Sequence, residues 1–381
     1  MKINNKVIVI GSNHVNTLGV IRSLGEEGIF PFVILHESSK YCYVKKSRYI
    51  KEFWITDDEL EIINILHNLS IKYSDTKNII IPTSDLALKI LDENYNDLSK
   101  NFYIPNIDNK EGKIIINMDK KLQQDDAKKV GLNSIFSIKL NLKNKINNSL
   151  LKDIPYPCII KPNSSYSGKK GDIVICNDQE MCKKELINLQ QLGYKEVLLQ
   201  EFIKCDNELD VIGFACKGKA YFCGRLKKLR ISPPKKGSAS FGKFMPVDNK
   251  DFYKKLSLYI KKLNFTGIFG ADVFETKENI FIEINFRNGA NNYALNYDGV
   301  NIVLLWIKSI LNYDLTKEKV QITNSFYFRN DIFERVELLK KNITLKEYFR
   351  TKKISKAQLF NVKKDKKPVI FKLVYAILKR L

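Results

Sequence analysis

The pattern of apolar and polar positions near the start of the chain predicts alternating strands and helices. Short apolar runs such as KVIVI are typical of buried parallel strands, and the stretches between them repeat apolar residues at the helical period. This order predicts a Rossmann-like domain over residues 1–109, although GSNHVNTLG lacks the GxGxxG spacing of a dinucleotide site. The pattern places strands at 6–10, 31–35 and 78–81 and helices at 16–27, 57–73 and 85–94.

Further along, alternation with a period of two predicts a β-hairpin over residues 269–286. Side chains two apart on a strand share a face, so Glu283, Asn285 and Arg287 line up, and Asp272 on the partner strand can reach the same side. Two carboxylates and an amide oxygen form a hard-oxygen set suited to Mg²⁺, which takes its remaining ligands from water and substrate phosphates. The alternative is a solvated face of ion pairs.

A lysine and a loop of small residues follow another apolar strand, predicted at 158–160. Lys161 ends that strand, and the run NSSYSGKKG leads into a second strand at 172–176. Backbone N–H groups of such a loop can bind phosphate oxygens, and the lysine adds a point charge. No GK[ST] opens a helix here, so this is not a Walker loop, and an ordinary hairpin turn explains the loop equally well.

The segment VLLQEFI at 197–203 predicts a strand that ends in an acid, and a second acid, Glu208, follows. Adenine needs an apolar slot with backbone donors and acceptors, whereas ribose hydroxyls need a carboxylate acceptor, and this segment offers both. Strands at 210–216 and 219–225 come next. The Pro, Gly and Ser content of RISPPKKGSASFGK at 230–243 then predicts a mobile, basic lid.

Composition limits the class of protein. A chain of 381 residues with 44% apolar content suits a globular protein of two or three domains. The formal charge of +22 comes mostly from lysine and indicates either a lysine-rich surface or an acidic partner. No nucleic-acid-binding motif is present, so we expect no nucleic-acid partner and, at most, steering of polyanions such as ATP.

Cysteine and histidine positions argue against a zinc site. The seven cysteines form no CxxC pair and no cluster with any of the three histidines. An odd, scattered set in a chain without a signal peptide predicts reduced thiols and a cytoplasmic location. No apolar run is long enough to span a bilayer.

The sequence leaves two interpretations open for each of two regions. Asn13 and Asp85 follow predicted strands, where open α/β sheets bind ligands, but both also fit helix-capping turns. The C-terminal sequence PVIFKLVYAILKRL predicts a basic, apolar helix opened by Pro368. This helix either docks against the protein's own core or makes peripheral contact with an anionic membrane.

The chain resembles the ATP-grasp superfamily over residues 109–310. The resemblance depends on five features in this order: Lys120, the lysine of IIKP, the Ser/Gly loop, QEFI with its later acid, and EINFR. Within this superfamily the chain is most similar to carboxylate-amine ligases of the D-aspartate ligase type, through NTLGVIRSL, SRY and EINFRNG. The resemblance implies an α/β fold with an α+β ATP-grasp core. It divides the chain into a Rossmann-like domain at 1–109, a two-subdomain ATP-grasp domain at 110–310 and a small basic region at 311–381.

The resemblance also implies roles for individual residues. Lys120 and Lys161 would bind the phosphates of ATP, Lys161 and Arg287 would be catalytic, and one or two Mg²⁺ ions, replaceable by Mn²⁺, would lie on the hairpin. The other implied roles are a closing flap with Ser164, Ser167 and Gly168, an adenine hinge of Glu201, Phe202 and Ile203, ribose binding by Glu208, metal binding by Asp272, Glu283 and Asn285, and substrate contacts by Asn13, Arg48, Asp85, Arg230 and Asn288.

The implied reaction joins an amine to a carboxylate through an acyl phosphate and releases ADP and phosphate. The implied partner is a small-molecule amino acid or acidic acceptor, and the chain is expected to form a dimer. The alternatives are a carboxylase or phosphoryl-transferring enzyme of the same fold and a nucleotide-binding relative without activity.

Overall fold

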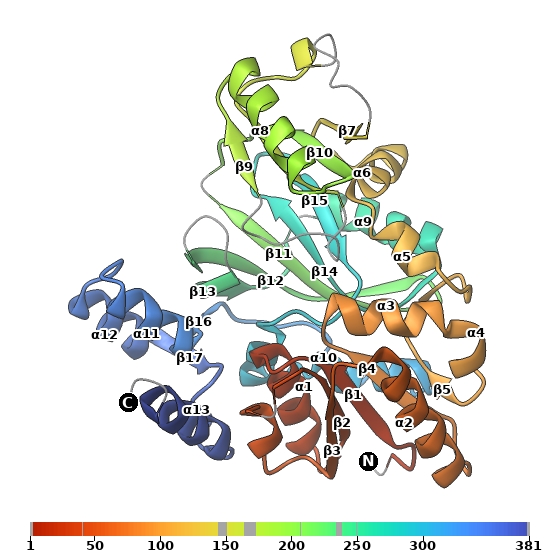
Figure 1. Ribbon diagram of the computed structural model, residues 1–381. Coiled ribbons are helices and arrows are strands. Elements are labelled where there is room, and N and C mark those ends of the chain that lie inside the picture. Colours follow the sequence, from red (N-terminus) through yellow and green to blue (C-terminus); the bar gives the residue numbers. More distant parts are fainter. Residues whose placement is uncertain are drawn as a thin grey trace.

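The computed structural model describes residues 3–39, 41–143, 151–163, 173–205, 207–233, 238–248 and 250–378 (Figure 1). Three β-sheets organise this part of the chain: a parallel sheet at the bottom of the view, an eight-stranded sheet in the middle and a four-stranded sheet at the top. Helices pack against all three sheets, so the predicted α/β class is confirmed. None of the described helices has the length and apolar character needed to cross a membrane.

The N-terminal domain has a five-stranded parallel sheet in the order β3-β2-β1-β4-β5, as in a Rossmann-like half. Alternate residues of β1 enter two different cores, one shared with α1 and the other with α2 and α3, because successive side chains of a strand point to opposite faces. The elements are β1 (Val7–Gly11), α1 (Val15–Gly25), β2 (Phe32–His36), η1 (Val44–Lys46), β3 (Glu52–Thr56), α2 (Glu59–Lys72), β4 (Asn78–Pro82), α3 (Asp85–Glu93), α4 (Tyr95–Leu98) and β5 (Phe102–Tyr103).

The four-stranded sheet is antiparallel, in the order β7-β10-β8-β9, and α8 packs against it. Asp178 caps the start of α8 by accepting a hydrogen bond from the backbone N–H of Met181. The apolar side chains of β8, β10 and α8 form a separate small core. The elements are β7 (Ser137–Asn141), β8 (Cys158–Pro162), β9 (Val174–Cys176), α8 (Gln179–Gln191) and β10 (Glu196–Glu201).

The large sheet has the order β15-β14-β11-β12-β13-β16-β17, with β6 paired to the start of β14. One face shares a core with α6 and α9, and the other shares a core with α10 that continues into α1 of the N-terminal domain. The elements are β6 (Asn106–Ile107), α5 (Lys113–Asn117), α6 (Lys120–Lys129), β11 (Glu208–Cys216), β12 (Lys219–Ser232), β13 (Ser238–Met245), α9 (Lys250–Leu263), β14 (Phe265–Phe274), β15 (Ile280–Asn285), η3 (Asn292–Asp298), α10 (Ile302–Ile310), β16 (Phe326–Arg329) and β17 (Ser355–Gln358).

The segment 230–243, which the sequence predicts as a mobile lid, belongs largely to two strands. β12 continues to Ser232, and β13 begins at Ser238 and pairs with it antiparallel. Glycine here serves close packing, because a Cβ on Gly242 would come within 2.6 Å of the Lys227 carbonyl oxygen and 2.7 Å of the Phe328 ring. The lid prediction is therefore wrong for residues 230–232 and 238–243, and residues 234–237 lie outside the described residues.

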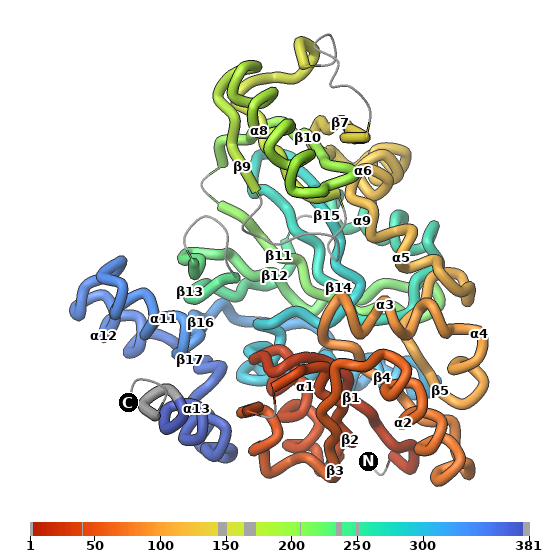
Figure 2. The backbone as a smooth tube through the Cα atoms, in the orientation of Figure 1, coloured from red at the N-terminus to blue at the C-terminus, as the bar shows by residue number. Residues whose placement is uncertain are grey.

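The C-terminal region adds β16 and β17 to the large sheet, so residue 310 does not mark an edge of that sheet. Figure 2 shows that the chain then runs down beside the N-terminal domain, where α13 contacts η1. The remaining elements are α11 (Asp331–Leu339), α12 (Leu345–Ile354) and α13 (Lys367–Leu378).

Polar and aromatic contacts hold the C-terminal segment on the N-terminal domain. The buried Arg22 donates from Nε to Asp365 at 2.9 Å, and the Lys372 ammonium lies 4.4 Å from the centre of the Tyr43 ring. Tyr375 stacks on Tyr41 with ring centres 4.8 Å apart. These contacts favour docking against the protein's own core over contact with a membrane.

Candidate functional site

The hairpin of β14 and β15 carries the predicted polar face. Asp272 lies opposite Glu283, and Gly270 lies opposite Asn285. The Asn285 amide donates to Asp272 Oδ2 at 3.1 Å, which leaves the Asn285 Oδ1 atom out of that hydrogen bond. The structure therefore brings the two carboxylates and the amide together on one face, and their role as metal ligands stays a prediction.

Helix α6 brings the first lysine to this face. Two side-chain to backbone hydrogen bonds join Gln123 to Ile284 of β15, at 3.0 and 2.8 Å, and fix the helix on the strand. Asp119 caps the helix by accepting from the backbone N–H of Leu122. Lys120, the first helical residue, then lies with its ammonium 3.3 Å from Glu283 Oε2.

The second lysine comes from the four-stranded sheet. Lys161 lies near the end of β8 and is buried, and the backbone N–H of Lys120 donates to the Asn163 carbonyl just beyond it. Burial lowers the pKa of Lys161 to about 8, while the nearby Glu283 carboxylate opposes the shift. Burial also works against the charge on Glu283, but Lys120 and Lys161 prevail and lower its pKa to about 2.

A third lysine, Lys228 of β12, was not singled out from the sequence. Its ammonium donates to Asp272 Oδ1 at 2.7 Å and also to Glu208. Burial opposes its charge, yet Asp272 and Glu208 raise its pKa above the ordinary value. Lys228 lies in a basic stretch at 225–230, and nothing in the sequence separates it from its basic neighbours.

A partly buried acid, Asp210 of β11, was also missed. It pairs across the sheet with Asp272, and burial and the Asp272 charge raise its pKa to about 7. Gly270 makes room for it, because a Cβ at that position would lie 2.7 Å from Asp210 Oδ1. Asp210 comes two residues after Glu208 and so faces the same way, a spacing that could have revealed it.

A cavity of about 280 Å³ lies beside these carboxylates, between the N-terminal domain and the large sheet. We call it the acceptor cavity. Asp85 and Arg287 meet there, with Arg287 Nε and Nη2 donating to the two carboxylate oxygens at 2.8 and 3.2 Å. Its lining comprises Ser12, His14, Asn16, Thr83, Ser84 and Asp85 from one domain and Asp210, Lys228, Ser238, Ala239, Gly270, Asp272, Asn285, Arg287, Gly289, Ala290 and Asn291 from the other.

The predicted substrate residues do not all line the acceptor cavity. Asp85 lines the acceptor cavity and is not the helix cap, because Ser84 accepts the capping bond from the Ala87 N–H. Asn288 lies behind the cavity wall and exchanges hydrogen bonds with Asn16. Asn13 is not among the lining residues; its side chain contacts the backbone of residues 41 and 44.

Arg48 and Arg230 lie away from the cavity lining. Arg48 is exposed and stacks near the Tyr49 ring. Arg230 donates at 2.6 Å to Glu334, a fully buried acid of α11, so its described partner is structural. Lys228, two residues earlier, takes the place in the site that was predicted for Arg230.

The predicted adenine hinge lies where β10 leaves the four-stranded sheet toward β11. Glu201 ends β10, and Phe202 donates from its backbone to the Pro157 carbonyl at 3.1 Å. Glu201, Phe202 and Ile203 are all partly exposed, as contact with a ligand requires. The flap residues Ser164, Ser167 and Gly168 lie outside the described residues.

The donor set fits a hard divalent cation. Asp272 and Glu283 offer carboxylates and Asn285 offers an amide oxygen, which are the ligand types that Mg²⁺ prefers. The Lys120 ammonium lies 3.3 Å from Glu283 Oε2, and Lys161 is a second positive charge near this carboxylate. The lysines therefore balance a negative charge that would otherwise attract a metal cation.

Comparison with known proteins supports this geometry. A family model described as the ATP-grasp domain matches residues 127–288. The formate-dependent phosphoribosylglycinamide formyltransferase of Sulfurisphaera tokodaii is 40% identical over 67 residues, which is 17% of this chain and 17% of that relative. The D-alanine--D-alanine ligase of Helicobacter pylori is 24% identical over 73% of this chain and 86% of its own length. The D-aspartate ligase of Enterococcus faecium is 22% identical over 64% of this chain and 62% of its own length.

Solved structures share the fold. An L-amino acid ligase from Bacillus licheniformis superposes with a TM-score of 0.65 at 11% identity, covering 86% of this chain and 80% of that one. A biotin carboxylase from Campylobacter jejuni superposes with a TM-score of 0.64 at 17% identity, covering 84% and 74%. The hairpin carboxylates, Lys161 and Lys228 all lie within the matched region, and residues 127–288 of this chain carry an ATP-grasp domain.

Proposed function

We propose that this protein is an ATP-dependent carboxylate-amine ligase that forms an amide bond through an acyl phosphate and releases ADP and phosphate. The observation that carries the proposal is the acceptor cavity, which opens directly beside the hairpin carboxylates and has the Arg287 guanidinium in its wall. A carboxylate bound there would lie next to the phosphates of an ATP held by the lysines. The names of the D-alanine--D-alanine and D-aspartate ligases give the same reaction type.

In this proposal the lysines and the hairpin form the phosphate-binding end of the site. Lys120 and Lys161 bind ATP phosphates and reduce the negative charge that opposes attack by a carboxylate. Asp272, Glu283 and Asn285 hold Mg²⁺, with Mn²⁺ as a substitute, and the cation supplies charge stabilisation for phosphoryl transfer. Glu283, which faces Lys120 in the structure, would be one of the carboxylates that hold this cation. Glu201, Phe202 and Ile203 contact adenine, and Glu208 contacts ribose.

Arg287 orients the acceptor in this proposal. Asp85 accepts from Nε and Nη2 of the guanidinium and so holds the group in place. The acceptor carboxylate would bind at the other edge, formed by Nη1 and Nη2, where Nη1 donates to the Asn288 carbonyl at 3.3 Å. The acceptor carboxylate attacks the γ-phosphorus of ATP, the bond to ADP breaks, and an acyl phosphate forms. The amine then attacks the acyl carbon and phosphate leaves, while Arg287 stabilises the tetrahedral oxyanion. No protein nucleophile takes part.

The lining of the acceptor cavity favours a small polar substrate. Among its described lining residues the apolar side chains are Ala239 and Ala290, and the other side chains present charges, hydroxyls, amides or the His14 imidazole. Arg287 and Lys228 suit carboxylates, while Asp85 and Asp210 suit an ammonium group. We propose amino acids or short acidic acceptors as substrates.

The test is a screen of amino acids and acidic acceptors, in pairs, for ADP release with Mg²⁺ and ATP. Ligation predicts release that depends on both an amine and a carboxylate, with a condensed product in the mass spectrum. ATP binding without turnover on any pair would contradict the proposal and favour a nucleotide-binding relative without activity.

A carboxylase is the second candidate, because a biotin carboxylase superposes over most of the chain. Release of ADP with bicarbonate and a single acceptor, without an amine-plus-carboxylate pair, would identify this outcome. A dimeric state, a cytoplasmic location and the absence of a nucleic-acid partner also remain proposals.

A further inference from the structure

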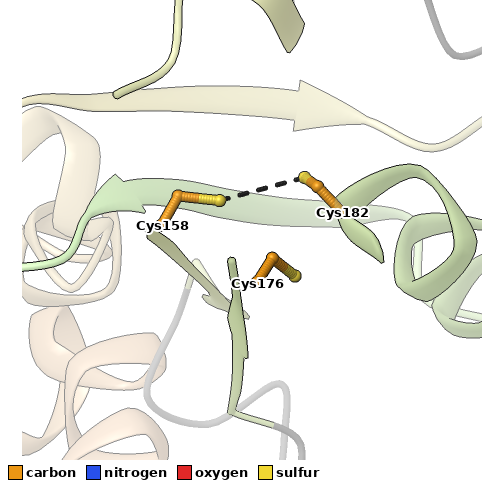
Figure 3. Close-up of side chains that lie close together, drawn as sticks. All are labelled: Cys158, Cys176 and Cys182. Carbon is orange, nitrogen blue, oxygen red and sulfur yellow. Dashed lines mark hydrogen bonds between the residues drawn. The ribbon is translucent and has the colours of Figure 1, made fainter. Parts of the chain in front are cut away.

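A cluster of three cysteines lies outside the nucleotide site, in the core of the four-stranded sheet. Cys158 comes from β8, Cys176 from β9 and Cys182 from α8, and all three are fully buried. Their sulfur atoms all lie within 4.8 Å of one another, and the Cys158 and Cys182 sulfurs are 3.9 Å apart (Figure 3). Along the sequence these cysteines look scattered. Spacing alone does not show that residues far apart in the chain meet in the fold.

The local structure explains why the three sulfurs converge. Cys158 and Cys176 are directly opposite in the antiparallel pair of β8 and β9 and point to the face that α8 covers. Cys182 lies on the buried face of α8, one helical turn before Leu186 and two turns before Leu189. Each cysteine is therefore placed by a different element, and the three meet where those elements pack.

The spacing of the sulfurs fits a thiolate metal site. A metal-sulfur bond of about 2.3 Å places two sulfurs about 3.8 Å apart in a tetrahedral site and about 4.0 Å apart in a trigonal one. Cysteine often fills cores as a small apolar residue, but that role needs no convergence of sulfurs from three elements.

We propose that Cys158, Cys176 and Cys182 form a binding site for a soft, thiophilic metal ion, with Cu(I) as the occupant. Soft thiolate ligands select Cu(I) over hard cations such as Mg²⁺. Among the described residues the group comprises these three sulfurs without a fourth His, Asp, Glu or Cys, which suits three-coordinate Cu(I) better than tetrahedral Zn²⁺. Binding replaces thiol protons, which are released to solvent, and ties β8 and β9 to α8.

The test uses the full-length chain, unfolded in urea and refolded without oxygen in the presence of a reductant, because buried sulfurs are reached most directly during folding. Cu(I) is supplied in a complex with bathocuproine disulfonate, which competes for the ion. We expect wild type to retain about one Cu(I) per chain and to show an ultraviolet thiolate-to-copper charge-transfer band. Zn²⁺ supplied in the same way serves as the second arm.

Matched variants locate the bound ion. Cys182→Ala should lose retention at least about 10-fold, whereas Cys223→Ala, which removes another fully buried cysteine on β12, should retain Cu(I) like wild type. Three outcomes would overturn the proposal. They are equal Cu(I) retention by Cys182→Ala and wild type, no Cu(I) retention by wild type, and tighter retention of Zn²⁺ than of Cu(I).

A measurement on wild type alone keeps the proposal testable if a variant fails to fold. Alkylation by iodoacetamide in mild urea, mapped by mass spectrometry, should be slowed by Cu(I) at the three cluster cysteines and unchanged at Cys223. Equal protection of Cys223 would contradict the site. The outcome is independent of ligase activity, so it leaves the proposed function untouched.

Discussion

The phosphate-binding end and the acceptor cavity are neighbours built in different ways. At the phosphate-binding end the carboxylates Asp272 and Glu283 are neutralised by three lysines, Lys120, Lys161 and Lys228. The lysines proposed to bind ATP and the carboxylates proposed to bind a metal therefore balance one another in this structure. The acceptor cavity instead draws its lining from two domains. The comparison teaches that the first region, if it binds nucleotide as proposed, needs only an exchange of ion partners within one domain, whereas the second depends on how the domains meet.

The largest expected effect comes from the phosphate-binding end. Glu283→Gln keeps the shape of the side chain and removes the charge that faces Lys120 and the proposed cation. We expect ADP release to fall by more than about 100-fold, because metal stabilisation of phosphoryl transfer is worth several kcal/mol. Coupled ADP assays at saturating Mg²⁺ measure it.

The matched control for this change is Glu278→Gln, an acid in the turn of the same hairpin. Its side chain is exposed and accepts from Asn133. It should keep wild-type turnover. Full turnover in Glu283→Gln, with an unchanged circular dichroism spectrum, would remove Glu283 from the metal site.

A smaller effect is expected in the acceptor cavity. Asp85→Asn weakens the two charge-assisted hydrogen bonds that orient Arg287 across the domain boundary. We expect kcat to fall about 10-fold through misorientation of the acceptor. KM for the acceptor should change while KM for ATP stays within about 2-fold, since Asp85 contacts only the cavity side. Asp97→Asn, an exposed acid of the same domain, is the control. An equal change in both KM values would argue against separate regions.

Arg230→Gln should affect stability and not the reaction. Glu334 is fully buried and accepts from Arg230 Nη1 at 2.6 Å, so the variant leaves a buried carboxylate without its cation. We expect the free energy of unfolding to fall by about 3 kcal/mol in urea titrations. Turnover below the melting range should stay within about 2-fold of wild type. A selective rise in acceptor KM without loss of stability would restore Arg230 to the substrate residues.

The smallest effect is a change in how stability depends on pH. The pKa of Asp210 is raised from 3.8 to about 7, so the folded chain holds a proton that the unfolded chain has released, and stability falls as pH rises from about 4 to about 7. Asp210→Asn removes this loss. The melting temperature of the variant minus that of wild type should therefore grow from pH 5 to pH 8 in EDTA. The exposed Asp57→Asn is the control, and a constant difference such as this control should give would contradict the shift.

Local patterns predicted much of the phosphate-binding end. Period-two alternation placed Asp272, Glu283 and Asn285 on one face, and the strand ending in Lys161 was recognised from its apolar run. Composition gave the wrong prediction for residues 230–232 and 238–243, which belong to strands, and Gly242 serves close strand packing there. Lys228 was missed because several basic residues stand together at 225–230, and irregularities in the pairing of β12 and β13 make period-two reasoning unreliable there.

The sequence by itself determined the order of strands and helices, the polar face of the hairpin and the resemblance to the ATP-grasp superfamily. These features depend on neighbours a few residues apart, where strand and helix periods fix the direction of each side chain. Only the tertiary structure decided the pairing of Asp85 with Arg287, 202 residues later, the entry of Lys228 and Asp210, and the meeting of three cysteines. These contacts arise where separate elements pack, and no local period encodes which distant surfaces will meet.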